Sequence, residues 1–444
     1  MPKLTFMGAG STVFAKNILG DSMLAEPLQN FEIALYDINK ERLEESQMMV
    51  KNLNASINAG RCRVSAYLGI ANRKDALRGA DFVVNAIQVG GYEPSTVIDF
   101  EIPKKYGIKQ TIADTLGIGG IMRGLRTAPI MIDFAREMEE VCPDALFLNY
   151  TNPMAIVTGA VLRATSIRTV GLCHSVQVCV PHLLEELGMN VNPDETRWSI
   201  AGINHMAWLL SINHGGIDLY PEIKKRAAEK NAAARKKGAE KHDDMVRLEL
   251  MRHFGHYVTE SSEHNSEYTP YWIKSAEPEL IEEFNIPLDE YPRRCVNQIE
   301  RWAKQRDEIV NDKNLSHTRS HEYGSYIMEA VVTGNPIRIH GNILNRGLIS
   351  NLPDDTCVEV PCLVDRNGVQ GVSVGALPPQ CAALNMTNIN VQELTIQAVL
   401  TGEREYAYQA AYLDPHTAGE LSLDRIRALV DDLLAAHGDM VKLK

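Results

Sequence analysis

Apolar runs alternate with amphipathic, helix-like stretches over the first part of the chain. The pattern predicts a strand at residues 3–7, a helix at 15–25 after a glycine turn, and a second strand at 31–37. Further strands are predicted at residues 80–89, 145–153 and 169–174. Because parallel strands need crossover helices between them, this alternation is typical of a doubly wound sheet. We therefore expect an α/β protein with an N-terminal, Rossmann-like parallel sheet.

The pattern changes near residue 195. Residues 198–216 have the pattern of a β-hairpin, and residues 221–250 have the charge-rich pattern of one long solvated helix. Further elements are predicted as strands at 335–343 and 355–365 and as helices at 388–400 and 423–438. A chain of this length exceeds one hydrophobic core. We expect a dinucleotide-binding domain at residues 1–195 and a C-terminal α+β domain at 196–444.

The composition and charge of the chain limit the kinds of molecule that it is expected to bind. The 444 residues are 45% hydrophobic and 23% charged, which is ordinary for a globular protein. The net charge of −12 argues against a nucleic-acid partner, which needs clustered Lys and Arg. The sequence has no recognisable signal peptide, no apolar stretch long enough to span a bilayer, and no CxxC pair among its eight cysteines. We expect a cytoplasmic protein that binds neither membranes nor nucleic acid.

A glycine turn between the first strand and the first helix predicts a dinucleotide site. Gly8 and Gly10 permit a tight turn, and the amides of Ser11 and Thr12 open the helix, where a pyrophosphate can bind. Asp37 ends the second strand, where its carboxylate can accept hydrogen bonds from a ribose 2′-hydroxyl. We expect these five residues to bind NAD.

Two features leave this interpretation open. Val13 stands in place of the third glycine of the usual fingerprint, so the turn could belong to a sheet that binds no nucleotide. Asp37 would repel a 2′-phosphate and so favours NAD over NADP, but Lys40 and Arg42 lie close behind it in the sequence.

Several polar residues could carry chemistry. Cys173 and His205 end apolar strands, where a doubly wound sheet presents its ligands. Together they could bind a divalent transition metal and leave positions open for substrate oxygens. His174 is a candidate general acid because imidazole titrates near neutrality, and Tyr268 is a candidate base if a cation lowers its pKa. Taken singly, each of these residues could instead be a structural side chain.

A set of longer motifs adds a resemblance. The chain contains, in this order, the segments FMGAGST, QTIADTLGIGGIMRGLRT, LNYTNPMA, GLCHSVQ, AGINHMA, VTESSEH, EYTP and LVDDLLAAHGD. They resemble glycoside hydrolase family 4, and within it the melibiase-type α-galactosidases. The matching segments are spread over essentially the whole chain.

The resemblance implies a metal and two catalytic groups. Cys173 and His205 correspond to the two protein ligands of a catalytic divalent metal, usually Mn²⁺. The Cys-His-Ser-Val sequence is similar to the α-galactosidase version of this motif, whereas Cys-Asp and Cys-Asn versions accompany phosphorylated sugars. His174 is therefore the expected proton donor and Tyr268 the expected base.

The mechanism implied by the resemblance is a transient oxidation, unlike the two-carboxylate chemistry of most glycosidases. A hydride would pass from C-3 of the galactosyl ring to NAD, which makes the C-2 proton acidic. Tyr268 would remove that proton while His174 assists departure of the aglycone, and water would add before the hydride returns. NAD is then regenerated in every turnover.

The resemblance also implies a substrate class. Asn152 corresponds to a substrate-contacting asparagine, and Asp114 and Arg294 are further expected sugar contacts. Terminal α-galactosides such as melibiose or raffinose are the favoured substrates. An α-galacturonide stays open, because galacturonide-specific members can share the Cys-His-Ser sequence and would need an arginine for the C-6 carboxylate. The family further suggests a homo-oligomer.

Two other classes of protein compete with a glycosidase. A conventional NAD-dependent dehydrogenase of small hydroxy acids would explain Gly8, Gly10 and Asp37, but it would accumulate NADH. A noncatalytic NAD-binding protein would leave the candidate metal ligands, acid and base unexplained.

Overall fold

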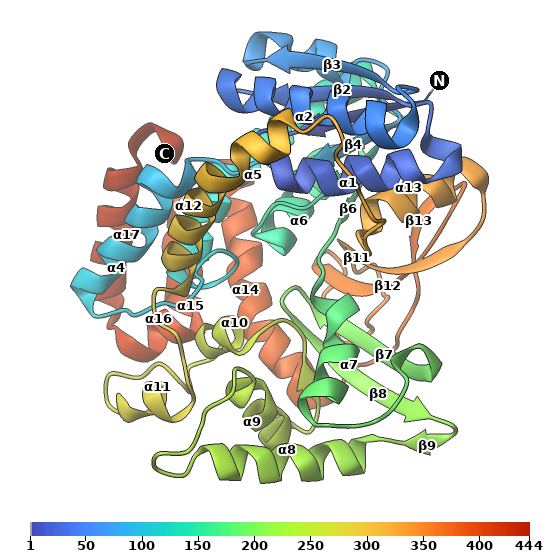
Figure 1. Cartoon of the computed structure of the whole chain (residues 1–444). Coiled ribbons are helices and arrows are strands. Elements are labelled where there is room, and N and C mark those ends of the chain that lie inside the picture. Colours follow the sequence, from blue (N-terminus) through green and yellow to red (C-terminus); the bar gives the residue numbers. More distant parts are fainter. Residues whose placement is uncertain (1) are drawn as a thin grey trace.

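The computed structural model describes residues 2–444. Its parallel strands are β1 (Lys3–Met7), β2 (Glu32–Asp37), β3 (Arg63–Leu68), β4 (Phe82–Asn85), β5 (Leu146–Asn149) and β6 (Arg168–Gly171). They lie in the order β3-β2-β1-β4-β5-β6, which is the Rossmann order (Figure 1). The expected Rossmann-like parallel sheet is confirmed.

Side chains that alternate along these strands enter two separate hydrophobic clusters. Phe82 and Val84 of β4 belong to the cluster that contains residues of α1 (Thr12–Leu24). Val83, which lies between them, belongs to the cluster that contains residues of α5 (Gly117–Val141) and α6 (Met154–Ala164). A strand buried on both faces has no solvent-facing row for polar residues, and this is why the apolar runs are continuous.

The sheet continues beyond β6 with antiparallel strands. These are β7 (Thr196–Ile203), β8 (Met206–His214), β9 (Ile217–Asp218), β10 (Tyr257–Val258), β11 (Ile337–Leu344), β12 (Cys357–Asp365) and β13 (Gly368–Gly371). β11 joins β6 by pairing Asn342 with Gly171, and β12 joins β7 by pairing Glu359 with Gly202. One sheet therefore includes strands from both sides of residue 195, and a domain boundary there stays a prediction.

Helices cover this sheet in two groups. The other α-helices are α2 (Lys40–Asn58), α3 (Arg73–Leu77), α4 (Val97–Tyr106), α7 (Ser175–Glu186), α8 (Tyr220–Ala234), α9 (Met245–Phe254), α10 (Ser262–Glu267), α11 (Glu279–Glu283), α12 (Glu290–Asn311), α13 (Tyr323–Thr333), α14 (Pro379–Thr401), α15 (Arg404–Leu413), α16 (Pro415–Glu420) and α17 (Leu423–His437). The first group contains α1, α2 and α13, and the second contains α5, α6 and α14. Helix α14, from the C-terminal half of the chain, thus packs on helices of the N-terminal half (Figure 1).

Two elements differ from expectation. β3 was not predicted, because its residues are half-buried or exposed and give only a weak apolar signal. The single long helix predicted at residues 221–250 is wrong, since α8 ends at Ala234 and α9 begins at Met245. Gly238 has a φ of 77° in this break, a left-handed conformation that cannot continue an α-helix. Within residues 2–444, no helix combines the length and apolar character needed to cross a bilayer.

Candidate active site

The glycine turn has the geometry of a dinucleotide site. Gly8 has a φ of 84°, and a Cβ placed on it would lie 2.9 Å from the backbone carbon of Ala86. The amides of Gly8 and Ala9 both donate to the Tyr36 carbonyl at 3.0 Å, which ties the turn to the end of β2. Only glycine therefore fits at position 8 without displacing the neighbouring strand end.

Asp37 is held against the same turn. One carboxylate oxygen accepts a hydrogen bond from the Gly10 amide at 2.7 Å, and the other accepts from the Asn39 amide at 2.8 Å. Each oxygen keeps a second lone pair for a ribose hydroxyl. Val13 is 48% exposed, so its side chain points out of the helix–sheet contact and does not strain the turn. Ser11 precedes α1 and Thr12 begins it, as a helix N-terminus that binds a pyrophosphate requires.

A second site is formed by side chains from distant parts of the chain. Cys173 follows β6, His205 lies in the turn between β7 and β8, and Glu260 follows β10. One ligand atom from each of these three residues lies within 4.8 Å of the other two. The family resemblance predicted Cys173 and His205 as ligands of one metal but did not indicate Glu260, although the VTESSEH segment contains it. A single acidic residue after a two-residue strand gives no signal of its own.

The charges of this cluster favour a cation. Burial lowers the pKa of His205, but the Cys173 sulfur and the Glu260 carboxylate outweigh burial and raise it to about 10. Burial raises the pKa of Glu260, yet His205 and His264 bring it below its ordinary value, so the carboxylate stays ionised. Nδ1 of His205 lies 3.3 Å from both the Thr115 and the Tyr268 hydroxyl oxygens. Nε2 is therefore the atom that faces the cluster.

This donor set fits a first-row transition metal. Thiolate, imidazole and carboxylate are its common protein ligands, and three protein ligands leave further positions for substrate. The second ring nitrogen of His205 contacts two hydroxyl groups, which orient the ring so that its other nitrogen is free to bind a metal. The residues present therefore fit the expected divalent metal.

Tyr268 is completely buried beside the cluster. Burial, together with the carboxylates of Asp114, Glu267 and Glu260, raises its pKa well above 10. The protein groups alone thus hold the phenol neutral. A role as a base requires a positive charge nearby, which a metal at Cys173, His205 and Glu260 would provide.

Two predicted sugar contacts meet next to Tyr268. The Asn152 amide donates to the Asp114 carboxylate at 3.0 Å, and the Thr115 hydroxyl donates to the other oxygen of Asp114 at 2.8 Å. Burial raises the pKa of Asp114, but the hydrogen bond from His264 and the charge of Arg123 hold it well below its usual range. A fixed carboxylate and amide beside the metal ligands are suited to bind sugar hydroxyls.

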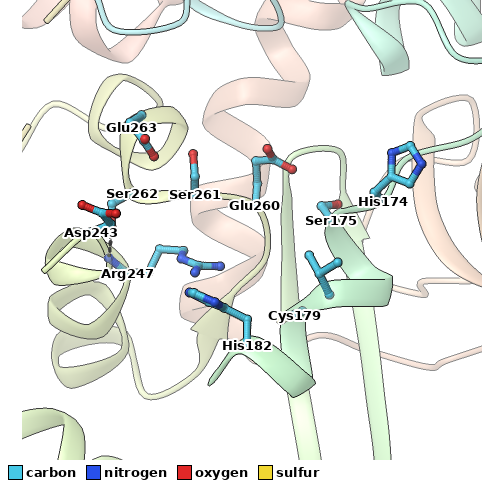
Figure 2. A pocket seen from close by; sticks show the side chains of 11 residues that line it. His174, Ser175, Cys179, His182, Asp243, Arg247, Glu260, Ser261, Ser262 and Glu263 are labelled. Carbon is cyan, nitrogen blue, oxygen red and sulfur yellow. Dashed lines mark hydrogen bonds between the residues drawn. The ribbon is translucent and has the colours of Figure 1, made fainter. Parts of the chain in front are cut away.

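His174 occupies a different position. Its Nε2 lies 2.6 Å from a Glu322 carboxylate oxygen, and its side chain is 51% exposed. The neighbouring Glu322 carboxylate raises the pKa of His174, although burial opposes this. Figure 2 shows its ring directed away from Glu260, at one end of the pocket. Glu322 comes from the segment before α13, and no sequence motif indicated this pairing.

Arg294 lies farther from the metal ligands than the other predicted sugar contacts. Its guanidinium donates to Glu290 at 2.6 Å and to Glu263 at 2.9 Å, and its side chain is half exposed. Glu263 lines a cavity of about 340 Å³ that is also bordered by His174 and Glu260 (Figure 2). The structure thus brings Cys173, His205, Tyr268, Asn152 and Asp114 together, while Arg294 reaches the pocket only through Glu263.

Fold and site together define a Rossmann-type protein with a candidate transition-metal centre formed where strands of its sheet end. Comparison with known sequences gives the family. The profile described as "Family 4 glycosyl hydrolase" matches residues 3–189, and that of the "Family 4 glycosyl hydrolase C-terminal domain" matches residues 200–417. With matches over both halves and a relative 60% identical along almost its whole length, the chain belongs to glycosyl hydrolase family 4.

The similar proteins include two named α-galactosidases. One from Bacillus subtilis (strain 168) is 60% identical over 439 residues, covering 99% of each chain. One from Rhizobium meliloti (strain 1021) is 32% identical over 446 residues, covering 98% of this chain and 88% of its own. The crystal structure of a 6-phospho-α-glucosidase from gut microorganisms, in complex with NAD and Mn²⁺, matches over all of both chains with a TM-score of 0.80 and 21% identity. This last likeness shows a shared fold.

Proposed function

We propose that this chain is an α-galactosidase that removes terminal α-galactosyl groups through transient, NAD-dependent oxidation of the sugar. The observation that carries the proposal is the meeting of Cys173, His205 and Glu260 with Tyr268 on the sheet that also holds the glycine turn. A conventional dehydrogenase would use the turn but has no need of the metal ligands. Membership of the glycosidase family and 60% identity to a named α-galactosidase support the same choice.

The chain's own residues divide into those that hold cofactors and those that hold the sugar. Gly8, Gly10, Ser11, Thr12 and Asp37 would bind NAD, whereas Cys173, His205 and Glu260 would bind Mn²⁺ or a similar divalent ion. When bound, NAD supplies a hydride acceptor and the metal supplies a Lewis acid. Asp114 and Asn152 would fix the hydroxyl groups of the galactosyl ring, so that its reacting carbons lie within reach of both sites.

Two residues would move protons. Tyr268 would take the proton from C-2 at its phenolic oxygen, and its contact with His205 keeps that oxygen beside the metal ligands. His174 would deliver a proton from its ring to the glycosidic oxygen. The Glu322 carboxylate favours the protonated form of this imidazole and orients its ring.

The charges around the site favour a neutral sugar over a galacturonide. Arg123 donates to the Tyr291 hydroxyl at 2.9 Å and faces the charge of Asp114. Arg294 is paired with Glu290 and Glu263. A C-6 carboxylate would have to compete with protein carboxylates for either arginine, and the unpaired carboxylates would be left buried at a cost.

The substrate class can be tested directly. The p-nitrophenyl α-galactoside and the p-nitrophenyl α-galacturonide should be compared with NAD, Mn²⁺ and a thiol reductant present. We expect kcat/KM to be at least about 100-fold higher for the galactoside, because an unpaired buried charge costs several kcal/mol. A preference for the galacturonide would assign the site to the other branch of the family.

We infer a reducing, cytoplasmic location and a homo-oligomer for the same enzyme. Cys173 must remain a free thiol to bind a metal, and all eight cysteines are unpaired in the structure. Light scattering of the purified protein at several concentrations tests the oligomer, since a single chain has a mass of 49.4 kDa.

A further inference from the structure

Glu267 is a buried carboxylate that belongs to neither the metal cluster nor the expected sugar contacts. It ends helix α10, directly before Tyr268, and is only 2% exposed. Oε2 accepts a hydrogen bond from the Thr111 amide at 2.8 Å, and Oε1 accepts from the amides of Ala113 at 2.7 Å and Ile112 at 3.2 Å. The carboxylate thus binds three consecutive backbone amides of a segment that is distant in the sequence.

These three amides depend on Glu267. They lie between α4 and α5, outside any helix or strand, and no backbone carbonyl within residues 2–444 accepts a hydrogen bond from them. All three residues are buried. Because a buried amide without an acceptor is costly, the conformation of residues 111–113 requires the carboxylate of Glu267.

The segment contains a residue in a conformation that alanine rarely adopts. Ala113 has a φ of 50°, in the left-handed region, and such a residue persists only where its surroundings fix its backbone. Glu267 binds its amide on one side. On the other side lies the first turn of α5, where a Cβ placed on Gly119 would be 2.7 Å from the Ala113 carbonyl oxygen. The backbone that leads into Asp114 is therefore held in one conformation.

This constraint acts where an expected sugar contact meets the expected base. Asp114 directly follows Ala113, and Tyr268 directly follows Glu267. The hydrogen bond from Ala113 to Glu267 therefore joins the backbone next to the sugar-binding carboxylate to the backbone next to the base. Proton removal from C-2 needs the base within hydrogen-bond reach of the sugar, and a misplacement of about 1 Å can lower the rate about 100-fold.

We propose that Glu267 is a positioning residue, which holds Asp114 where the sugar binds and sets its distance from the base Tyr268. It acts through the backbone amides of residues 111–113 and does not itself touch the substrate. The inference rests on the proposed α-galactosidase activity, in which Asp114 binds hydroxyl groups of the galactosyl ring.

The test measures binding of galactose, the product, by calorimetry with NAD and Mn²⁺ present. Glu267→Gln keeps the size of the side chain but replaces one accepting oxygen by an NH₂ group, which faces a backbone amide in either orientation. The Kd of galactose should rise about tenfold, as expected for the loss of one hydrogen bond, while metal content and NAD affinity stay within about twofold. Glu267→Asp keeps the charge but withdraws it from the amides, so it should weaken galactose binding in the same way.

A double-variant cycle separates positioning from a general loss of stability. Because Glu267 acts through Asp114, Glu267→Gln in an Asp114→Asn background should weaken galactose binding by less than about twofold beyond Asp114→Asn alone. Asp21→Asn is a matched control. Asp21 is a fully buried carboxylate of α1 that accepts from the Ser320 amide at 2.8 Å, and its replacement should lower the unfolding temperature without changing the Kd of galactose.

Two results would overturn the positioning role. One is an unchanged Kd of galactose in both Glu267 variants, and the other is a loss of the same size with and without Asp114→Asn. Wild-type enzyme that neither binds galactose nor cleaves any α-galactoside would instead refute the proposed activity, and the inference with it.

Discussion

The glycine turn and the metal cluster differ in the groups they use for binding: backbone groups in the turn, and side-chain atoms in the cluster. The turn at residues 8–11 works through backbone amides and a left-handed dihedral angle, and its one essential side chain, Asp37, is close in the sequence. The cluster works through individual side-chain atoms of Cys173, His205 and Glu260, each from a different strand end. We expect the turn to be disturbed by an added side chain. We expect the cluster to lose its function when a single ligand atom is replaced.

The largest effect is expected at the cluster. Cys173→Ser replaces sulfur by oxygen at nearly constant shape, and it should bring bound metal and turnover to background because a neutral hydroxyl is a poor ligand for a transition metal. Metal content by mass spectrometry and hydrolysis of an aryl α-galactoside measure both. Cys62→Ser, at a buried thiol outside the site, should keep metal and activity. Full metal content in Cys173→Ser would show that the cluster does not hold the ion.

Removal of the base should have the next largest effect. Tyr268→Phe deletes one oxygen at the contact with His205, and kcat should fall by about 10³, within the usual range for a general base. Exchange of the C-2 hydrogen with deuterated solvent, followed by NMR, should fall in parallel. Tyr257→Phe removes another buried hydroxyl, one bonded to Asp244, and should leave the exchange rate nearly unchanged. Undiminished exchange in Tyr268→Phe would exclude Tyr268 as the base.

An added side chain in the glycine turn should reduce stability. Gly8→Ala combines a φ of 84° with a Cβ only 2.9 Å from the backbone of Ala86, so it should cost about 2–3 kcal/mol of stability and weaken NAD binding. Gly60→Ala has a φ of 72° but no atom within 4 Å of the new Cβ, so it should cost only about 1 kcal/mol. Thermal unfolding and NAD titration compare the two variants. Equal costs would mean that the close approach at Gly8 is unimportant.

The smallest effect is expected at Glu322. Glu322→Gln keeps the size of the side chain but removes the charge next to His174, and it should lower turnover of methyl α-galactoside about fivefold or less. Because Glu322 raises the pKa of His174, its loss should move the alkaline limb of the pH profile to lower pH. Glu329→Gln, on the following helix, should leave the profile in place. If the alkaline limb does not move in Glu322→Gln, Glu322 does not raise the pKa of the catalytic acid.

The two regions also differ in how far the sequence predicts them. The turn could be predicted almost completely, because Gly8, Gly10 and Asp37 belong to one βαβ unit with fixed spacing. The cluster could be predicted only in part. Cys173 and His205 follow strands that can be recognised from the sequence, whereas Glu260 follows the two-residue strand β10 and Glu322 comes from a loop without a pattern.

The overall fold shows the same limit. The buried strands β1, β4, β5 and β6 were predictable because their runs are apolar on both faces. The edge strand β3 and the break between α8 and α9 were not, because both depend on tertiary surroundings. The joining of β6 to β11 brings together residues about 170 positions apart, and no local pattern encodes such a contact.

The most direct test of the account is reconstitution of activity. Purified protein is stripped of cofactor and metal, and hydrolysis of p-nitrophenyl α-galactoside is followed as NAD and Mn²⁺ are added back singly and together, with NADH absorbance recorded throughout. We expect hydrolysis only when both are present, and no accumulation of NADH over many turnovers. Hydrolysis without NAD, or NADH formed in proportion to product, would contradict it.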